Sequence, residues 1–347
     1  MHYRFKLFIF GIVIGIFSCE EPYELSLNTT TSILAVNGIL NDKDTSQSIT
    51  IIENKALDGL FYTEEIPSLK VELLVNNSEK ILLTKRDKGQ YFLPNQFKIL
   101  PNNTYKLVFQ KEGGDRYEST VQALTAPSKM DKIYDDFVME GKLYNGKKLP
   151  SNYIYADFQD NPQQKNNYVW TWILWERQNY CGINFIYDIY CNKYCLEIFR
   201  NEAFETYSDV LSNGKTIKGN LIAKIPYYNY QGSLLEIRQL NVTPEAFRYF
   251  NIFNDQTYNT GTLADVPPAP LIGNIKNLDN PKEDIAGLFT VASADIQKYW
   301  IGRENAQGKT APLTTLLRQP NPHPFNIVGA CEEGFGRTSK LPIGWRE

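Results

Sequence analysis

The chain has 347 residues and a net charge of −3, with 36 Lys and Arg residues against 39 Asp and Glu residues and no polybasic arm. Nucleic-acid binding draws heavily on Lys and Arg, so this charge balance argues against a nucleic-acid partner. The 42% of hydrophobic and 13% of aromatic residues can fill real cores, and the length exceeds the usual size of one core, so we expect two folded domains.

The first 18 residues have the pattern of a lipoprotein signal peptide. Two basic residues precede an apolar run at 7–17, which is too short to cross about 30 Å of hydrocarbon as a helix. Ile16 and Ser18 stand three positions and one position before Cys19, as lipoprotein signal peptidase requires. We therefore predict that Cys19 is the lipidated N-terminus and that residues 19–30 form the tether. The alternative is an ordinary secretory signal followed by a chance cysteine.

Short alternating runs separated by turn residues predict a β-sandwich over residues 31–126. The expected strands are 32–40, 47–53, 70–74, 80–84, 89–92, 104–109 and 116–124. Their number and spacing are typical of an immunoglobulin-like or transthyretin-like sandwich, in which Tyr105 would be the corner tyrosine. The acidic turn at 41–44 could hold calcium, but one acidic turn is usually only a turn, so we predict no metal site.

After a junction at Ala126-Pro127-Ser128 the pattern changes, and we expect residues 127–347 to form a mixed, mainly β domain with a few helices. The expected strands are 154–158, 168–175, 216–225, 234–240, 285–292 and 298–302, and a helix is expected at 199–211. A second helix is expected from Thr243-Pro244-Glu245, which supply an N-cap hydroxyl, a proline at the first helical position and an early carboxylate. Phenylalanines at 247, 250 and 253 give that helix an apolar stripe, which predicts core packing rather than a partner groove.

Four cysteines remain once Cys19 is lipidated. They are Cys181, Cys191, Cys195 and Cys331. An even number in an exported protein predicts two disulfides, and we favour one long link from the 181–195 cluster to Cys331 because it closes the longest loop. The sequence leaves the pairing open. A four-cysteine zinc site is the alternative, although the spacing does not give two close pairs.

A proline-rich segment at 265–271 cannot form regular structure, because proline lacks the backbone donor and fixes φ. We expect an extended surface segment whose restricted backbone lowers the cost of binding a partner. The candidate partner-binding residues are Val266, Pro267, Pro268, Pro270 and Leu271. The alternative is a loop packed over its own domain.

No catalytic motif is found in the sequence. Only His323 remains after removal of the signal peptide, and its flanking prolines favour a solvated loop. Zincin, phosphate-loop, Gly-x-Ser-x-Gly and dinucleotide patterns are absent, so we predict neither an enzyme nor a cofactor. Trp170 and Trp172 share one strand face, with Trp175 opposite, and could stack on sugars, although core packing is the commoner role.

Several stretches together resemble one family, the Bacteroidota outer-membrane lipoproteins known as domain of unknown function 4249. They are Ser18-Cys19-Glu20-Glu21, residues 34–38, 256–258, 267–275 and Gly287-Leu288-Phe289, and a tail that runs from Cys331 through residues 334–338 to Trp345. Relatives often carry a second cysteine in this tail, which this chain lacks. The order of these stretches carries the resemblance, which spans the mature chain.

The resemblance implies a location and a partner rather than a reaction. Such proteins are encoded beside TonB-dependent outer-membrane transporters, and Glu20-Glu21 fits the acidic signal for the cell surface in that phylum. We therefore expect a surface-exposed outer-membrane lipoprotein that is an accessory, lid-like subunit of a TonB-dependent transporter. The alternatives are a lipid-tethered hydrolase with carboxylates that form no local motif, and a structural or adhesion protein.

Overall fold

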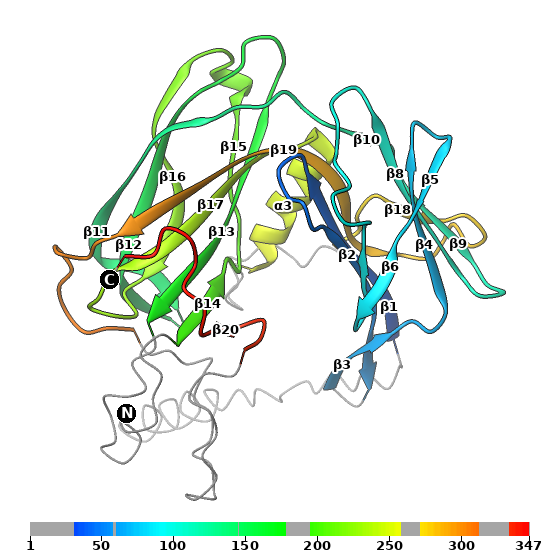
Figure 1. Ribbon diagram of the computed structural model, residues 1–347, viewed down its shortest axis with the longest axis horizontal. Helices are drawn as coiled ribbons and strands as arrows, with labels where there is room; N and C mark the ends of the chain where they lie inside the picture. Colours follow the sequence, from blue (N-terminus) through cyan, green and yellow to red (C-terminus); the bar gives the residue numbers. More distant parts are fainter. Residues whose placement is uncertain are drawn as a thin grey trace, which may run out of the picture.

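The computed structural model describes residues 31–57, 60–144, 146–177, 195–257, 271–311 and 333–346. These residues form two β-rich lobes side by side, with α3 (Pro244–Thr257) between them (Figure 1). The predicted fold class is confirmed, because the chain is mostly β, starts with a sandwich and continues into a second, mainly β part.

The first lobe, called the N-lobe, is a sandwich of two layers. One layer contains β1 (Thr31–Asn41), β2 (Ser48–Leu57), β3 (Leu60–Glu65), β6 (Thr84–Asp87) and β7 (Gln90–Phe92). The other contains β4 (Leu69–Val75), β5 (Glu79–Leu82), β8 (Thr104–Lys111), β9 (Arg116–Ser119), β10 (Gln122–Ala123) and β18 (Ile275–Asn277). Alternate side chains of both layers, such as Ile49 and Leu73, fill the core between them. Tyr105 is buried, and its hydroxyl accepts the Leu100 N–H at 2.7 Å, as a corner tyrosine would.

The second lobe, called the C-lobe, also packs two sheets face to face. A three-stranded sheet contains β11 (Met130–Tyr144), β12 (Lys147–Gln159) and β16 (Thr216–Pro226). It faces β13 (Asn167–Arg177), β14 (Leu196–Arg200), β15 (Glu205–Ser208), β17 (Ser233–Asn241), β19 (Ala286–Ile301) and β20 (Arg337–Thr338). Trp170 and Trp172 point into the core between these sheets, and Trp170 has no exposed surface, so the predicted shared face is a core face.

Strand β19 joins the two lobes. Its first half pairs in parallel with β1, from Ala286 opposite Ala35 to Ala292 opposite Asn41. Its second half pairs with β17 in the antiparallel sense, from Ser293 to Ile301. Within the described residues, one sheet of eleven strands therefore runs through both lobes, and Figure 1 shows β19 crossing from one to the other.

Helix α3 begins where the sequence predicts. Thr243 Oγ1 accepts the Ala246 N–H at 3.3 Å, which satisfies one of the free donors of the first turn. Ala246 and Phe250 are buried against β13, β17 and β19, in a third apolar cluster at the junction of the lobes. The helix therefore fills the angle between the lobes.

The prediction of a helix at 199–211 is wrong. Residues 196–200 and 205–208 are strands β14 and β15, both antiparallel to β13, and a short 3-10 turn follows at Asp209–Leu211. Asn201 makes the turn between these strands, because its Oδ1 accepts the Trp172 N–H at 3.2 Å while its Nδ2 donates to the Ala203 carbonyl at 3.1 Å. Hydrogen bonding to the open edge of β13 outweighs the local helical pattern.

Candidate functional site

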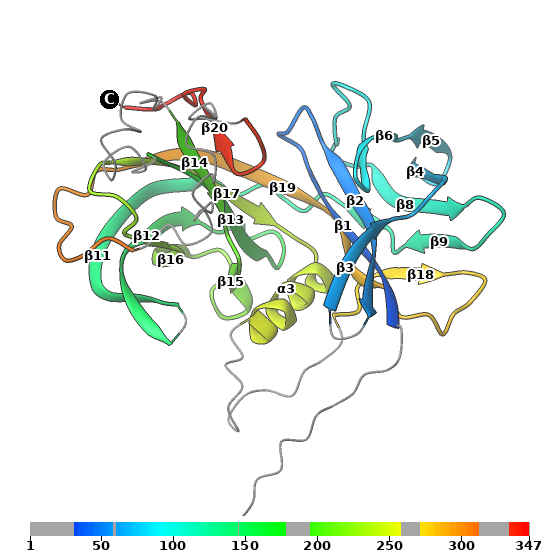
Figure 2. The same cartoon turned by 90° about the horizontal axis from the view of Figure 1, so that it is seen from below.

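An apolar groove lies between α3 and the N-lobe sheet. Figure 2, seen from below, shows α3 beside β1 and β2. The groove has a volume of about 210 Å³. It is lined by residues of six segments: Ala35, Val36, Asn37 and Ile39, then Thr50 and Ile52, then Phe204, then Tyr249, Phe250 and Phe253, then Leu271, and last Ala286, Gly287 and Leu288. Strands β1 and β2 form the floor of the groove, and the aromatic side chains of Phe204 and α3 form one of its walls.

The aromatic wall is held by ring contacts. The Phe204 ring lies 4.6 Å from the Phe250 ring and 5.4 Å from the Phe253 ring, measured between centroids. Phe204 is fixed in turn by Asn254, which accepts its N–H at 2.8 Å and donates to its carbonyl at 2.6 Å. Burial raises the pKa of the Tyr249 phenol, so this side chain is neutral at physiological pH. The wall suits apolar side chains rather than a charged ligand.

The groove contains one of the predicted partner-binding residues. Leu271 lines it, and the Leu271 carbonyl accepts the Gly287 N–H at 3.2 Å. Val266, Pro267, Pro268 and Pro270 lie outside the described residues. Leu271, the last residue of the proline-rich segment, therefore lies at the groove.

Of the predicted cysteine sites, only Cys195 is described. It is buried, at 2% exposure, and is bonded in a disulfide whose partner lies outside the described residues. Cys19, Cys181, Cys191 and Cys331 also lie outside them, as does His323. The lipidation of Cys19 and the two-disulfide arrangement stay predictions.

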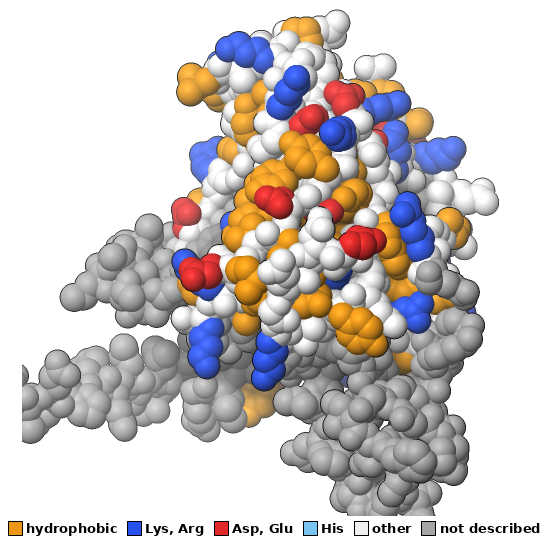
Figure 3. Space-filling view, turned by 90° about the vertical axis from the view of Figure 1, so that its left-hand side faces the viewer, with side chains coloured by type: hydrophobic (Ala, Val, Ile, Leu, Met, Phe, Trp, Pro, Cys, Tyr) orange, Lys and Arg blue, Asp and Glu red, His pale blue; other side chains and the backbone are white. Residues whose placement is uncertain are grey.

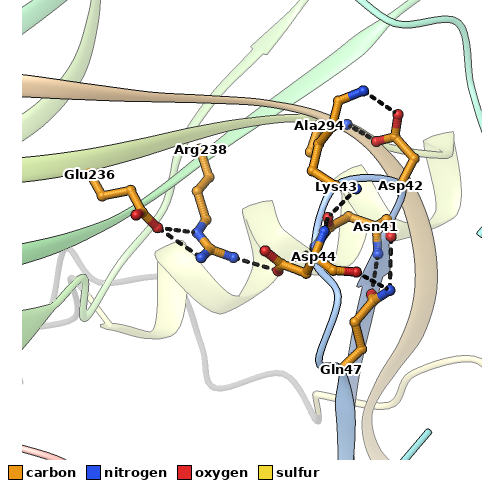
Figure 4. Close-up of polar contacts among 8 residues, drawn as sticks. All are labelled: Asn41, Asp42, Lys43, Asp44, Gln47, Glu236, Arg238 and Ala294. Carbon is orange, nitrogen blue, oxygen red and sulfur yellow. Dashed lines mark hydrogen bonds and ion pairs between the residues drawn. The ribbon is translucent and has the colours of Figure 1, made fainter. Parts of the chain in front are cut away.

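The loop between β1 and β2 fastens the N-lobe to the C-lobe (Figure 4). Arg238 of β17 donates to Asp44 Oδ2 at 2.6 Å and to Glu236 Oε1 at 2.7 Å. Asp42 Oδ1 accepts the Ala294 N–H at 2.8 Å, where β19 passes from one lobe to the other. These bonds fix the lobes relative to each other, and thereby fix the floor of the groove relative to its aromatic wall.

The same loop is organised from within by amide side chains. Asn41 Oδ1 accepts the N–H groups of Lys43 and Asp44, each at 2.9 Å, and Gln47 Oε1 accepts the Asn41 N–H at 2.7 Å (Figure 4). The acidic side chains that the sequence placed in a possible calcium turn are thus engaged with Arg238, Lys43 and Ala294.

Two buried ion pairs lie in the C-lobe, on strands β13 and β14. Arg303 Nη1 is 3.0 Å from Glu176 Oε1, and both side chains are fully buried. Burial raises the pKa of the Glu176 carboxyl to about 7, although Arg303 lowers it. Arg337 Nε donates to Glu197 Oε1 at 3.0 Å, which ties β20 to β14. Removing one partner from such a pair leaves a buried charge, so both pairs hold segments in place.

The outer face of the three-stranded sheet carries partly exposed tyrosines. The rings of Tyr134 and Tyr155 stack with centroids 5.7 Å apart, and the Lys132 ammonium lies 5.1 Å from the Tyr134 ring centroid. Figure 3 shows this side of the molecule, where hydrophobic side chains run between acidic and basic ones. The Tyr134 and Tyr155 rings contact each other and Lys132, and they cover part of the outer face of the sheet.

A second recess, of about 220 Å³, opens beside β12 and β13 and is lined by Tyr153 and Trp172. Its charged groups are paired in two salt bridges, Lys142 to Glu202 at 3.3 Å and Lys224 to Glu205 at 3.5 Å. Trp172 is only 8% exposed there, which leaves little of its ring for stacking on a sugar.

The fold and site define a class: a mostly β protein of two lobes with an apolar groove at their junction. In the described ranges, no three His, Cys, Asp or Glu side chains come together to hold a metal ion. None of the described helices is long and apolar enough to span a membrane. The chain belongs to the family described as Domain of unknown function (DUF4249), which matches residues 20–298. The match confirms the family domain, and the tail from Cys331 to Trp345 lies outside the matched residues. No curated protein matches the chain.

Sequence reasoning missed most of the groove. The sequence predicts a helix over Phe204, and no pattern in it identifies Ile39, Ile52 or Tyr249 as lining residues. Two signals in the sequence bear on the groove. One is the proline segment, which ends at Leu271, and the other is the apolar stripe of α3, because Phe250 packs into the core while Phe253 extends the stripe into the groove.

Proposed function

We propose that this protein is a surface-exposed outer-membrane lipoprotein, anchored through Cys19, that serves as an accessory subunit of a TonB-dependent transporter. Membership of the family supports the location and the partner, since its members are expected beside such transporters. The lipoprotein signal pattern that ends at Cys19 supports the anchor. Several acyl chains on one cysteine hold a protein at a membrane where a single chain would not.

The apolar groove is the observation that carries the proposal of a protein partner. It offers Phe204, Phe253 and Leu271 to whatever binds, and few polar groups. A groove of about 210 Å³ accommodates a few apolar side chains of a protein segment, and glycans would need more hydrogen-bonding groups. The partner segment is therefore an apolar stretch of the transporter's extracellular surface. The lobes form a rigid frame for this contact, because β19 and the Arg238 salt bridges join them.

Purification from outer membranes in mild detergent tests the proposal. The wild-type protein should carry a barrel transporter with it, and Cys19→Ser should lose membrane attachment while its folded lobes stay intact. The double variant Val266→Ser with Leu271→Ser should lose the transporter while its melting temperature stays unchanged. Leu211→Ser is the matched control, since Leu211 is 90% exposed and does not line the groove.

Two outcomes would count against the proposal. A wild-type protein that migrates alone in mild detergent would remove the transporter as partner. A double variant that melts several degrees lower and keeps the transporter would place these two side chains in the protein's own core.

A further inference from the structure

The tail of the chain, residues 333–346, presents apolar side chains to solvent on the C-lobe. Phe335 is 77% exposed, Ile343 is 87% exposed and Leu341 is 41% exposed. Single apolar side chains are common on protein surfaces, whereas several on one short segment are typical of a contact surface.

The turn that carries Phe335 is held rigidly. The Ile198 N–H of β14 donates to the Gly336 carbonyl at 2.9 Å, and Arg337 is bonded to the buried Glu197. Arg200 Nη1 donates to the Phe335 carbonyl at 2.8 Å, and its guanidinium carbon lies 3.8 Å from the centroid of the Phe335 ring. The ring therefore stays in place at the surface, which lowers the entropy cost of inserting it into a partner.

Basic side chains lie beside the exposed apolar ones. Lys340 is exposed in the tail itself, and Lys298 Nζ donates to the Ile343 carbonyl at 2.9 Å. The Arg177 guanidinium lies 5.6 Å from the Trp345 ring centroid. None of the basic side chains next to the tail forms an ion pair with a described carboxylate; they are Arg177, Arg200, Lys298, Lys340 and Arg346.

The charge of this surface is the opposite of the charge of the whole chain, which is −3. Burial lowers the pKa of the Arg200 guanidinium, and the charge of Arg238 lowers it further, as expected for a cation without an anionic partner. Within residues 333–346, Glu333 is the one carboxylate, and it accepts the Ser339 N–H at 2.8 Å. Unpaired cations around apolar side chains are complementary to an anionic surface with an apolar interior.

The tail turn lies at the end of the molecule where the tether enters. Figure 1 shows β20 and the start of β1 at the lower end of the molecule, and both face the viewer in Figure 2, which is seen from below. The tether, residues 19–30, spans at most about 40 Å when fully extended. A lipid on Cys19 therefore keeps this end of the molecule close to the bilayer.

We propose that the tail face, made of Phe335, Leu341, Ile343 and the five basic side chains beside them, rests on the phosphate-bearing surface of the membrane that holds the anchor. Apolar side chains flanked by Lys and Arg are typical of segments that lie at a membrane interface. The apolar side chains enter the boundary between headgroups and acyl chains, and the planar guanidinium of Arg200 suits a phosphate.

This contact rests on the proposed function, because it requires the anchor at Cys19. Few side chains take part, so the tail face alone would bind a membrane weakly. The tether turns that weak contact into an intramolecular one with a high effective concentration of lipid. The consequence is orientation, since the C-lobe is then held against the membrane surface.

Tryptophan fluorescence of the full lipoprotein in vesicles tests the contact. The vesicles contain phosphatidylcholine and phosphatidylglycerol with bromine on the acyl chains, which quenches a tryptophan that reaches them. Phe335→Trp should be quenched beyond the wild type, whose five tryptophans set the baseline. Leu82→Trp is the matched control, since Leu82 is 58% exposed on β5, in the upper part of Figure 1, and it should show no extra quenching.

A charge reversal tests the role of the cations. Lys340→Glu, introduced together with Phe335→Trp, should reduce the extra quenching about twofold or more, because it replaces attraction to anionic lipid with repulsion. Lys215→Glu is the control, since Lys215 is exposed in the loop after β15 and donates to the Leu211 carbonyl at 3.4 Å. It should leave the extra quenching unchanged.

Flotation of the vesicles separates this proposal from the anchor. A protein that floats with them but shows no extra quenching at position 335, or equal quenching at 335 and 82, would overturn the contact and leave the anchor standing. Equal losses from the two charge reversals, or extra quenching only when a transporter is added to the vesicles, would also overturn it. A protein that does not float would contradict the anchor itself, and the contact with it.

Discussion

Arg238 Nη1 lies 2.6 Å from Asp44 Oδ2, and this bond joins the central strand β17 of the C-lobe to the first loop of the N-lobe. The side chains of Arg238 and Asp44 are about one-quarter exposed, so water screens the pair only in part. Together with β19, this salt bridge holds the two lobes in a fixed position relative to each other.

Asp44→Asn should lower the free energy of unfolding by about 1–2 kcal/mol, because the ion pair with Arg238 becomes a hydrogen bond from the guanidinium to an uncharged amide. Lys43→Gln should change it by less than about 0.5 kcal/mol, since the Lys43 side chain, paired with Asp42, is about half exposed. Chemical denaturation of both variants measures the difference. Equal effects of the two substitutions would show that the bond between the lobes contributes no more than a surface ion pair.

Gly287→Ala should destabilise the protein by about 3 kcal/mol or more. Gly287 has φ +96°, and a Cβ atom there would lie 1.8 Å from the Val36 carbonyl oxygen, within the parallel β1–β19 pairing. Gly334→Ala is the control, because a Cβ at that position meets no atom within 4 Å. Thermal melting of both variants should show a large drop for the first and little change for the second. Similar melting temperatures would mean that the β1–β19 junction adapts to a side chain.

Glu176 should make stability depend on pH. Burial raises its pKa from 4.5 to about 7, so between these values the folded protein holds a proton that the unfolded chain releases. The contribution is therefore fully present below pH 4.5 and is lost as the pH rises through about 7.

Glu176→Gln removes this titration. The free energy of unfolding of the wild type minus that of the variant should fall by about 1–3 kcal/mol from pH 5 to pH 8. Denaturant titrations at the two pH values measure this change. Glu140→Gln, at a carboxylate that is 77% exposed, should follow the wild type. Parallel pH profiles for wild type and Glu176→Gln would contradict the account.

Much of the fold could be predicted because it depends on local signals. The start of α3 at Thr243-Pro244-Glu245 is an example, since a cap hydroxyl, a proline and a carboxylate act within one turn. β14 and β15 could not be predicted, because they are strands through their pairing with β13, an earlier part of the chain that no local pattern in residues 196–208 reports. The sequence predicts two strands, 285–292 and 298–302, with a break between them. The structure has one continuous strand there, β19, in which the polar Asp295 accepts the Met130 N–H at 2.8 Å.

The candidate site was harder to predict than the fold. Its lining comes from β1, β2, α3, β19 and the turn at Phe204, and no periodicity in one segment reports such an assembly. The proline segment and the apolar stripe of α3 gave the two pointers to it, through Leu271 and Phe253.

The four remaining cysteines should all be oxidised in the mature protein. Cys195 is already bonded in a disulfide, and the expected partners are among Cys181, Cys191 and Cys331. An unfolded sample treated with a thiol-alkylating agent should gain no mass without reductant, and four labels with it. Labelled thiols without reductant, together with copurified zinc, would replace the disulfides with a metal site.

The most direct measurement of the proposed partnership is photo-cross-linking in intact cells. A photoreactive residue replaces Phe253 in the groove and, in a second strain, Leu82 of β5, which is 58% exposed on the N-lobe and does not line the groove. Position 253 should cross-link to a TonB-dependent transporter identified by mass spectrometry, and position 82 should not. Absence of a transporter cross-link from 253 in a membrane-attached protein, or equal cross-linking from both positions, would contradict the proposal.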